Sequence, residues 1–202
     1  MVKPQASEVC GVVLAGGQGR RMGGIDKGLV SFAGQPLAAH AVACLRPHVG
    51  SVLINANRHH EDYAALADGV FKDAAEGFQG PLMGIYSALE AADSPWVMVV
   101  PCDSPLLPHD LVPRMLAGWR EGMDILVAHD GERLHPVVAL LAGHLREDLA
   151  QALAQGERKI DRWYARHAWA TVDLSDCADA FANLNTEEER QRLEPTRPGE
   201  GS

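Results

Sequence analysis

Short apolar runs alternate along the chain with stretches of helical period, and this alternation constrains the fold more than any other feature. The apolar runs, rich in Val, Ile and Leu, occupy residues 10–14, 52–54, 96–100, 125–128 and 137–141, with a further strand predicted at 170–174. The helical stretches occupy residues 37–46, 61–67, 82–92, 111–121, 144–155, 159–167 and 186–193. Near-continuous apolar runs are typical of strands buried on both faces. The alternation therefore predicts an α/β protein whose mainly parallel sheet is covered by helices on both sides.

The length and charge of the chain exclude several classes of protein. Its 202 residues suffice for one large domain, and 47% are hydrophobic and 22% charged, as in ordinary globular proteins. We expect a single domain over residues 1–194 and a disordered Pro/Gly-rich tail over residues 195–202. The formal net charge of -9 argues against a nucleic-acid-binding surface, because such a surface usually needs a basic face.

The cysteine pattern and the lack of targeting segments favour the cytoplasm. No stretch approaches the roughly 18 apolar residues that would span a bilayer, and the N-terminal MVKPQASEV lacks the apolar core of a signal peptide. The four cysteines include no C-x-x-C pair, which indicates reduced thiols rather than a disulfide framework or a zinc site. We therefore expect a cytoplasmic protein that binds neither membranes nor nucleic acids.

The first apolar run leads directly into a glycine-rich, basic segment, AGGQGRRMGGIDKG. Its spacing excludes a dinucleotide-binding fingerprint, because Gly17 and Gly19 are followed by Met22 where G-x-G-x-x-G needs its third glycine. The spacing also excludes a P-loop, because Lys27 follows Asp26 rather than a glycine. Both familiar phosphate-binding loops are thus ruled out.

We interpret this segment as a loop that holds the phosphates of a nucleotide in another way. Gly16, Gly17 and Gly19 allow backbone N–H groups to approach phosphate oxygens closely. Arg21 and Lys27 would supply positive charge to a triphosphate. The alternative is a solvated loop without a ligand.

Polar residues that follow the apolar runs are candidates for a binding site, because an open parallel sheet binds ligands outside the carboxyl ends of its strands. Asn55, Asn57, Asp73 and Asp103 occupy such places. Asp103 is a candidate ligand for Mg²⁺, which needs only one or two carboxylates when phosphates and water complete its coordination. The alternatives are that Asp103 caps the turn before Pro105 and that Asp73 lies in a solvated turn.

Other familiar catalytic patterns do not occur in the sequence. The nine histidines match no metal-binding spacing, and there is no G-x-S-x-G motif of the hydrolases. Cys102 is interpreted as a small buried residue rather than a catalytic thiol. Arg133 and His135, which lie just ahead of an apolar run, either face the site or belong to an ordinary loop.

Seven blocks of sequence together resemble the molybdenum cofactor guanylyltransferase family. They read LAGGQGRRMGGIDKG, NANRH, FKDA, GPLMGI, PCDSPLL, HDGERLHPVVAL and FANLNTEEE, and their order matches the family over residues 9–193. The resemblance implies a Rossmann-like, three-layer α/β/α fold of the nucleotide-diphospho-sugar transferase type. It also implies an enzyme that joins GMP from GTP to the terminal phosphate of molybdopterin or Mo-molybdopterin and releases pyrophosphate.

The resemblance implies roles for individual residues. On the nucleotide side it places Leu14, Ala15, Gly16, Lys27, Asn55, Asp73 and Asp103, which the loop interpretation extends to Gly17 and Gly19. On the pterin side it places Gly80, Pro81, Gly84, Asn183 and Asn185, to which we add the candidates Arg133 and His135. Asp103 would also hold Mg²⁺. The implied partners are pterin-delivering proteins and molybdoenzyme chaperones, and we expect a monomer.

The chemistry of the acceptor explains why no histidine or serine constellation is needed. A phosphate monoester has a second pKa of about 6, so it is already largely ionised at pH 7 and requires no general base. Catalysis then consists of positioning and charge neutralisation at the α-phosphorus, for which Arg21, Lys27 and Asp103 with Mg²⁺ are the candidates.

Three alternatives remain open at the level of sequence. The related cytidylyltransferases typically read L-A-A-G where this chain reads Leu14-Ala15-Gly16-Gly17, and the presence of a second glycine in this motif favours GTP. A sugar-phosphate nucleotidyltransferase would share the loop and the acidic metal ligand but not the NLNTEEE segment. A non-catalytic pterin carrier is disfavoured, because it has no use for Lys27 and Asp103 around a leaving pyrophosphate.

Overall fold

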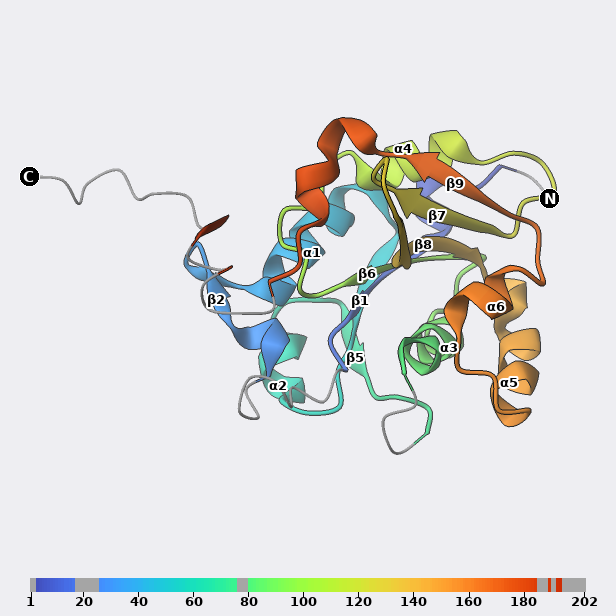
Figure 1. The fold of residues 1–202 in the computed structure, drawn as a ribbon. Helices are drawn as coiled ribbons and strands as arrows, with labels where there is room; N and C mark the ends of the chain where they lie inside the picture. Colours follow the sequence, from blue (N-terminus) through green and yellow to red (C-terminus); the bar gives the residue numbers. More distant parts are fainter. Residues whose placement is uncertain (1–2, 17–25, 76–79, 185–188, 190–191, 194–202) are drawn as a thin grey trace, which may run out of the picture.

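A seven-stranded sheet forms the centre of the protein (Figure 1), which we describe from a computed structural model over residues 3–16, 26–75, 80–184, 189 and 192–193. The strands, in their order across the sheet, are β5 (Gly69–Phe71), β4 (Ser51–Asn55), β1 (Val9–Leu14), β6 (Trp96–Pro101), β8 (Leu134–Ala142), β7 (Ile125–His129) and β9 (Trp169–Asp173). Neighbouring strands pair in parallel except where β8 pairs with β6 and β7. The prediction of a mainly parallel sheet is confirmed.

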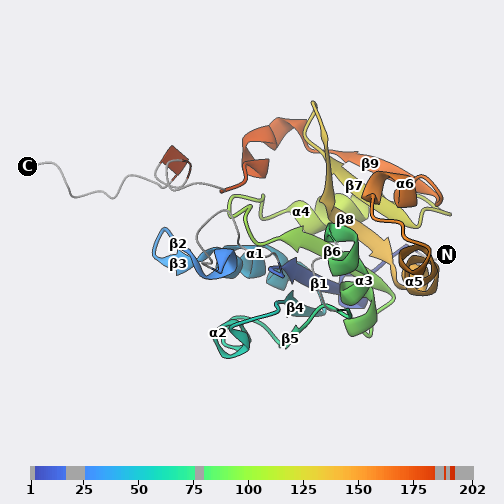
Figure 2. The same cartoon turned by 60° about the horizontal axis from the view of Figure 1, so that its bottom comes forward.

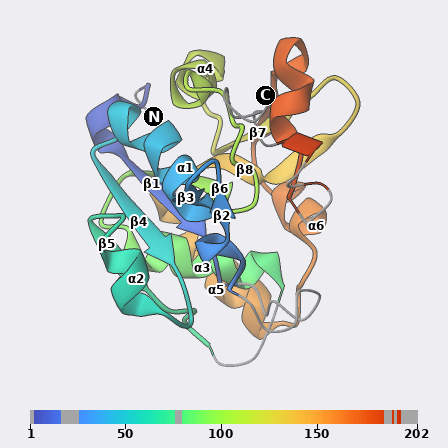
Figure 3. The same ribbon diagram turned by 90° about the vertical axis from the view of Figure 1, so that its left-hand side faces the viewer.

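Helices cover both faces of the sheet, as predicted. On one face lie α1 (Leu37–Leu45) and α4 (Leu111–Gly118), and on the other lie α3 (Pro81–Ala91) and α5 (Arg146–Ala154) (Figure 3). The short α2 (His60–Ala64) contacts the edge strand β5, and α6 (Ile160–Tyr164) follows α5. A small hairpin of β2 (Ser31–Phe32) and β3 (Gln35–Pro36) leads into α1 (Figure 2). The chain thus has the three-layer architecture expected.

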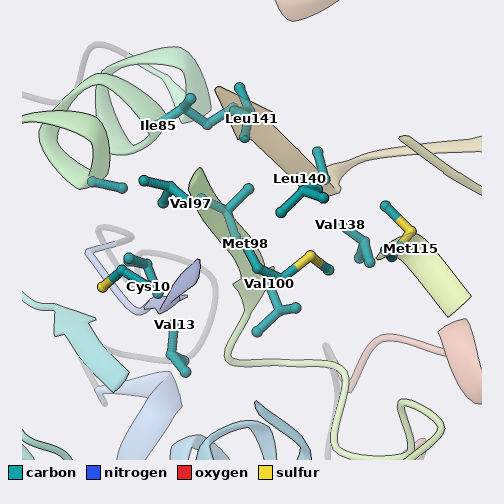
Figure 4. Close-up of a cluster of buried hydrophobic side chains, with 14 of the residues drawn as sticks. Cys10, Val13, Ile85, Val97, Met98, Val100, Met115, Val138, Leu140 and Leu141 are labelled. Carbon is teal, nitrogen blue, oxygen red and sulfur yellow. The ribbon is translucent and has the colours of Figure 1, made fainter. Parts of the chain in front are cut away.

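The core lies on both faces of the central strands. Val97 of β6 and Leu141 of β8 are directly opposite each other in the sheet, and both are completely buried. Figure 4 shows Leu141 pointing toward Ile85 of α3, whereas Val138 lies next to Met115 of α4. Burial of each such side chain stabilises the fold by about 1.5–3 kcal/mol relative to exposure. This double coverage explains why the strands read as uninterrupted apolar runs.

Several predicted boundaries differ from those observed. The helices predicted at 61–67, 111–121 and 159–167 are shorter, and the one predicted at 144–155 begins with a 3-10 turn before α5. The strand predicted at 137–141 begins earlier, at Leu134, because its first residues form a half-exposed arm that pairs with the end of β7. Most of the helix predicted at 186–193 and the tail at 195–202 lie outside the described residues, so the domain boundary at 194 stays a prediction.

The pairing of β7 with β8 is interrupted by a bulge, and a buried tyrosine donates a hydrogen bond to this bulge. Val127 lies opposite Ala139, but the next residue, Ala128, lies opposite His135, so residues 136–138 bulge from the ladder. The hydroxyl of the buried Tyr164 donates a hydrogen bond of 2.8 Å to the carbonyl oxygen of Pro136 in this bulge. Burial also raises the pKa of Tyr164, which keeps the hydroxyl protonated as a donor.

Membrane and thiol features also follow from the structure. Across the described residues no helix combines the length and apolar character needed to cross a bilayer. All four cysteines are free thiols, and Cys10, Cys44 and Cys102 are buried.

We expect Tyr164→Phe to lower the free energy of unfolding by about 1–3 kcal/mol, because the carbonyl of Pro136 would lose its donor in a partly buried place. Urea unfolding followed by circular dichroism measures this change. The matched control is Tyr86→Phe, since Tyr86 is only partly buried on α3, and its effect should stay within about 0.5 kcal/mol. Equal stabilities of Tyr164→Phe and the unsubstituted chain would contradict the assigned hydrogen bond.

Candidate active site

The order of the strands places a crevice at the carboxyl end of β1. From β1 the chain moves through α1 to β4 and β5 on one side, and it returns through α3 to β6 on the other side. Ligands of open α/β sheets bind at such a reversal, outside the carboxyl ends of the strands. Both loops that flank this reversal, the one after β1 and the one after β6, were predicted to carry site residues.

A cavity of about 270 Å³ opens at this edge of the sheet. Its lining residues come from the ends of β1, β4 and β6, the segment after β5, the start of α3 and the bulge in β8: Leu14, Gly16, Asn55, Asp73, Gly80, Pro81, Gly84, Pro101, Asp103 and Val137. All except Pro101 and Val137 are among the predicted site residues. The structure therefore brings the predicted nucleotide side and part of the predicted pterin side around one cavity.

An ion pair joins the two loops across the crevice. Lys27 begins the 3-10 turn Lys27–Leu29, and its Nζ lies 2.6 Å from Oδ2 of Asp103, which follows β6. The two side chains are 24% and 20% exposed, so the pair is shielded but still reachable from solvent. A carboxylate and an ammonium group are thus held together at the point where the fold predicts an anionic ligand.

A network of amides fixes Asp73 beside the start of the glycine-rich loop. Asn55, only 2% exposed, donates from Nδ2 to Oδ1 of Asp73 at 3.0 Å. Asn57 donates from Nδ2 to Oδ2 of Asp73 at 2.8 Å and to the carbonyl of Gly16 at 3.1 Å. The backbone N–H of Asp73 in turn donates to Oδ1 of Asn57 at 2.9 Å. Both carboxylate oxygens of Asp73 are therefore hydrogen-bonded within the protein.

Asn57 is a site residue to which the resemblance gives no role, although it stands with Asn55 in the NAN segment after a strand. Its amide nitrogen donates to Gly16 and Asp73, and its amide oxygen accepts from the backbone N–H of Asp73. Asn57 therefore orients Gly16 and Asp73, which line the cavity, without lining it itself. The repeated amide after a predicted strand is the only signal in the sequence that points to it.

The loop after β1 comes so close to these amides that Gly16 admits no side chain. A Cβ atom at this position would lie 2.7 Å from Oδ1 of Asn55 and 3.2 Å from Nδ2 of Asn57. The neighbouring Ala15 is also fixed, because its N–H donates to the carbonyl of Asn55 at 2.8 Å. The start of the loop is thus set by direct contact with the end of β4.

The N-terminus of α3 forms another wall of the cavity. Gly80 adopts a φ of 83°, which favours glycine, and Pro81 occupies the first helical turn, where its missing N–H costs nothing. The unpaired N–H groups of a helix start favour anions. Ser87 of α3 accepts a hydrogen bond of 2.9 Å from the N–H of Ala74, which links this helix to the segment carrying Asp73.

Two predicted pterin-side residues, Arg133 and His135, do not line the cavity. Nε2 of His135 lies 2.7 Å from Oδ2 of Asp130, and its ring stacks on Phe181 with centroids 4.3 Å apart. The N–H of Arg133, the ring of His135 and the N–H of Glu132 hold the pKa of Asp130 well below its usual range. Arg133 contacts the same carboxylate through Nε at 3.5 Å. These residues build the tip of the β7–β8 hairpin.

Asn183 is hydrogen-bonded to the loop after β6 that carries Asp103. Its Oδ1 accepts a hydrogen bond of 2.8 Å from Oγ of Ser104, and the next residue, Leu184, donates its N–H to the carbonyl of Asp103 at 2.8 Å. The end of the described chain is therefore tied to the loop that carries Asp103. The roles predicted for Asn183 stay predictions, as do those of Gly17, Gly19, Arg21 and Asn185, which lie outside the described residues.

The interpretation of Cys102 as a small buried residue is confirmed. Cys102 is 6% exposed, and burial together with the charge of Asp103 raises the pKa of its thiol to about 12. The thiol is therefore protonated near neutral pH and is a poor nucleophile.

Comparisons with known proteins decide the family. The model of the MobA-like NTP transferase domain family matches residues 11–172. A molybdenum cofactor guanylyltransferase from Shewanella amazonensis is 50% identical over 183 residues, which cover 90% of this chain and 93% of the relative. One from Shewanella pealeana is 48% identical over 189 residues, covering 93% and 94%. This chain belongs to the molybdenum cofactor guanylyltransferase family.

Solved structures agree with the fold of this guanylyltransferase family. Molybdopterin-guanine dinucleotide biosynthesis protein A from Archaeoglobus fulgidus superposes with a TM-score of 0.75 at 23% identity, covering 92% of this chain and 96% of that one. 2-C-methyl-D-erythritol 4-phosphate cytidylyltransferase from Thermus thermophilus superposes with a TM-score of 0.68 at 19% identity, covering 91% and 96%. The chain is a nucleotidyltransferase by family, and it shares the fold of these solved structures.

We expect Gly16→Ala to weaken nucleotide binding by this guanylyltransferase family member at least about tenfold, a loss of about 1.4 kcal/mol. The added methyl group would collide with Asn55 and Asn57 and displace the loop after β1. Calorimetric titration with GTP and Mg²⁺ measures the dissociation constant.

Gly84→Ala provides a matched comparison on the same cavity wall. There a Cβ atom would meet Leu14 Cδ2 at 3.6 Å and Asn55 Oδ1 at 3.8 Å, which are ordinary contacts. We expect its dissociation constant for GTP to stay within about twofold of the original value, less than 0.5 kcal/mol. Equal losses in both variants would contradict the role given to the close approach at Gly16.

Proposed function

We propose that this chain transfers GMP from GTP to the terminal phosphate of molybdopterin or Mo-molybdopterin. A bond forms between an acceptor phosphate oxygen and the α-phosphorus, and the bond from that phosphorus to the β-phosphate oxygen breaks, so that pyrophosphate leaves. The observation that carries this proposal is the pair of Lys27 and Asp103, 2.6 Å apart across the crevice at the carboxyl ends of β1 and β6. The names of the relatives support the choice of the guanylyl group and the acceptor.

The composition of the cavity fits an acceptor that needs no general base. In the described part of the chain its lining consists of Gly, Pro, aliphatic, Asn and Asp residues, without His, Cys or Ser. A phosphate monoester with a second pKa of about 6 is an ionised nucleophile at pH 7. The chain then has to orient this oxygen opposite the leaving pyrophosphate and to neutralise the charge on the phosphates.

Asp103 fits the requirements of a Mg²⁺ ligand. Among the described residues no three His, Cys, Asp or Glu side chains gather into a cluster, so the protein would contribute few ligands. Such a composition suits Mg²⁺, which is usually held by one or two carboxylates, phosphate oxygens and water. Asp73 is less available, since both of its carboxylate oxygens already accept amide hydrogen bonds. When bound at Asp103, Mg²⁺ would supply charge neutralisation for the triphosphate.

Lys27 would carry the second positive charge of the site. Its ammonium group lies 2.6 Å from the carboxylate of Asp103, which lines the cavity, so it can turn to phosphate oxygens without leaving this edge of the sheet. Arg21 and the amides around Gly17 and Gly19 would add to this charge, and Asn183 and Asn185 would face the pterin.

We also propose that the chain works in the cytoplasm as a monomer, receiving molybdopterin from pterin-delivering proteins and passing the product to molybdoenzyme chaperones. The four free cysteines support a reducing compartment. The names of the relatives place the reaction in molybdenum cofactor synthesis.

We expect the purified chain, supplied with Mg²⁺ and molybdenum-loaded molybdopterin, to release pyrophosphate with GTP but not with CTP or ATP. A coupled pyrophosphate assay measures the three rates side by side. Release with CTP in place of GTP would refute guanylyl transfer while keeping the mechanism, and no release with any of the three would favour a pterin carrier.

Replacing Asp103 tests whether its carboxylate is needed for the proposed reaction. Asp103→Asn should lower turnover by about 10²-fold or more, because removal of one charge-stabilising group in a preorganised site typically has such an effect. Asp110→Asn is the matched control, since Asp110 is exposed later in the same loop and its side chain makes no capping hydrogen bond to α4. Thermal unfolding should show both variants folded. Near-normal turnover of Asp103→Asn would remove this residue from the metal role.

A further inference from the structure

A buried tyrosine lies against the chain on both sides of Lys27. Tyr63 belongs to α2, is 0% exposed, and donates a hydrogen bond from its hydroxyl to Oδ1 of Asp26. Asp26 directly precedes Lys27 and begins its 3-10 turn, because its carbonyl accepts the N–H of Leu29 at 3.1 Å. The side chain of Asp26 is thus fixed by a residue from a different part of the fold.

On the other side of Lys27, the tyrosine packs against the backbone of Gly28. A Cβ atom at Gly28 would lie 2.3 Å from the Tyr63 hydroxyl oxygen and 3.1 Å from two ring carbons. Gly28 is itself buried, so the ring leaves no room for any other residue at this position. The positions before and after Lys27 are therefore both held by one hydroxyl group and its ring.

On the opposite side of the ion pair, two backbone hydrogen bonds fix the segment that carries Asp103. The N–H of Cys102 donates to the carbonyl of Leu14 at 3.1 Å, and the carbonyl of Asp103 accepts the N–H of Leu184 at 2.8 Å. Lys27, in contrast, has a long flexible stem that loses about 2 kcal/mol of rotamer entropy when it is immobilised. The accuracy with which its ammonium group meets Asp103 therefore depends on how firmly its backbone is held.

We propose that Tyr63 is a positioning residue for nucleotidyl transfer, which acts through Asp26 and Gly28 to hold Lys27 at the triphosphate site. This inference rests on the proposed function, since it gives Tyr63 a task in the same reaction. Tyr63 does not line the cavity among the described residues. Burial and the hydrogen bond to Asp26 raise the pKa of Tyr63, so its hydroxyl acts as a hydrogen-bond donor and not as an acid or base near neutral pH.

The test compares single and double variants of the Tyr63–Asp26 pair. Tyr63→Phe and Asp26→Ala each remove the hydrogen bond, and we expect each to lower kcat/KM for GTP about tenfold, with the KM for molybdopterin within about twofold of its original value. Because both variants remove the same interaction, the double variant should be no worse than either one. Asp26→Asn keeps an oxygen that accepts from the Tyr63 hydroxyl, so it should retain most of the activity.

Two controls separate positioning from a general loss of structure. Tyr86→Phe removes a tyrosine hydroxyl from partly buried α3 and should leave kcat/KM unchanged. Thermal unfolding of every variant reports how far the fold is affected. A merely structural tyrosine would predict losses of kcat/KM that follow the unfolding temperature from variant to variant.

Binding of GTP with Mg²⁺, measured by calorimetry, keeps this test independent of turnover. The dissociation constant should weaken in Tyr63→Phe and Asp26→Ala but not in Asp26→Asn. Unchanged binding and turnover in Tyr63→Phe, or losses that multiply in the double variant, would overturn the positioning role. If the unsubstituted chain binds GTP but transfers nothing, the proposed function fails, while the comparison of dissociation constants still decides the role of Tyr63.

Discussion

Hydrogen bonding of β1 to a parallel strand on each side is the constraint from which the site follows. Because β4, β1 and β6 run in the same direction, the loops after all three strands emerge at one edge of the sheet. The reversal of strand order at β1 separates these loops enough to leave a cavity between them. Lys27 and Asp103, which are 76 positions apart in the sequence, become neighbours for this reason.

The groups that hold the site are distinct from the groups that face the cavity. Asp103 and Gly16 line the cavity, whereas the hydrogen bonds of Asn57 and the hydroxyl of Tyr63 are directed at the protein itself. Both supporting residues come from the segment that follows β4, and they fix the two described ends of the glycine-rich loop at Gly16 and Asp26. The two described ends of this loop are thereby held by side chains that do not line the cavity.

How far the sequence could predict this structure depended on whether a feature is local. The buried runs of β1 and β6 were recognisable because burial on both faces leaves no polar alternation, whereas β5, with only three half-buried residues, shows no such run. The reversed direction of β8 was not predictable, since an apolar run reads the same in either direction. The positioning role inferred for Tyr63 was not predictable either. It depends on contacts with Asp26 and Gly28, which are 37 and 35 positions away in the sequence and become neighbours of Tyr63 only in the folded chain.

Transfer of a labelled phosphorus atom from GTP distinguishes nucleotidyl transfer from transfer of the terminal phosphate. The chain would be incubated with Mg²⁺, molybdenum-loaded molybdopterin and GTP labelled at either the α- or the γ-phosphorus, and the pterin product would be separated and counted. Attack at the α-phosphorus by an acceptor phosphate predicts label in the pterin from α-labelled GTP and none from γ-labelled GTP. Label from the γ-position, or an unlabelled pterin with both substrates, would contradict nucleotidyl transfer at this site.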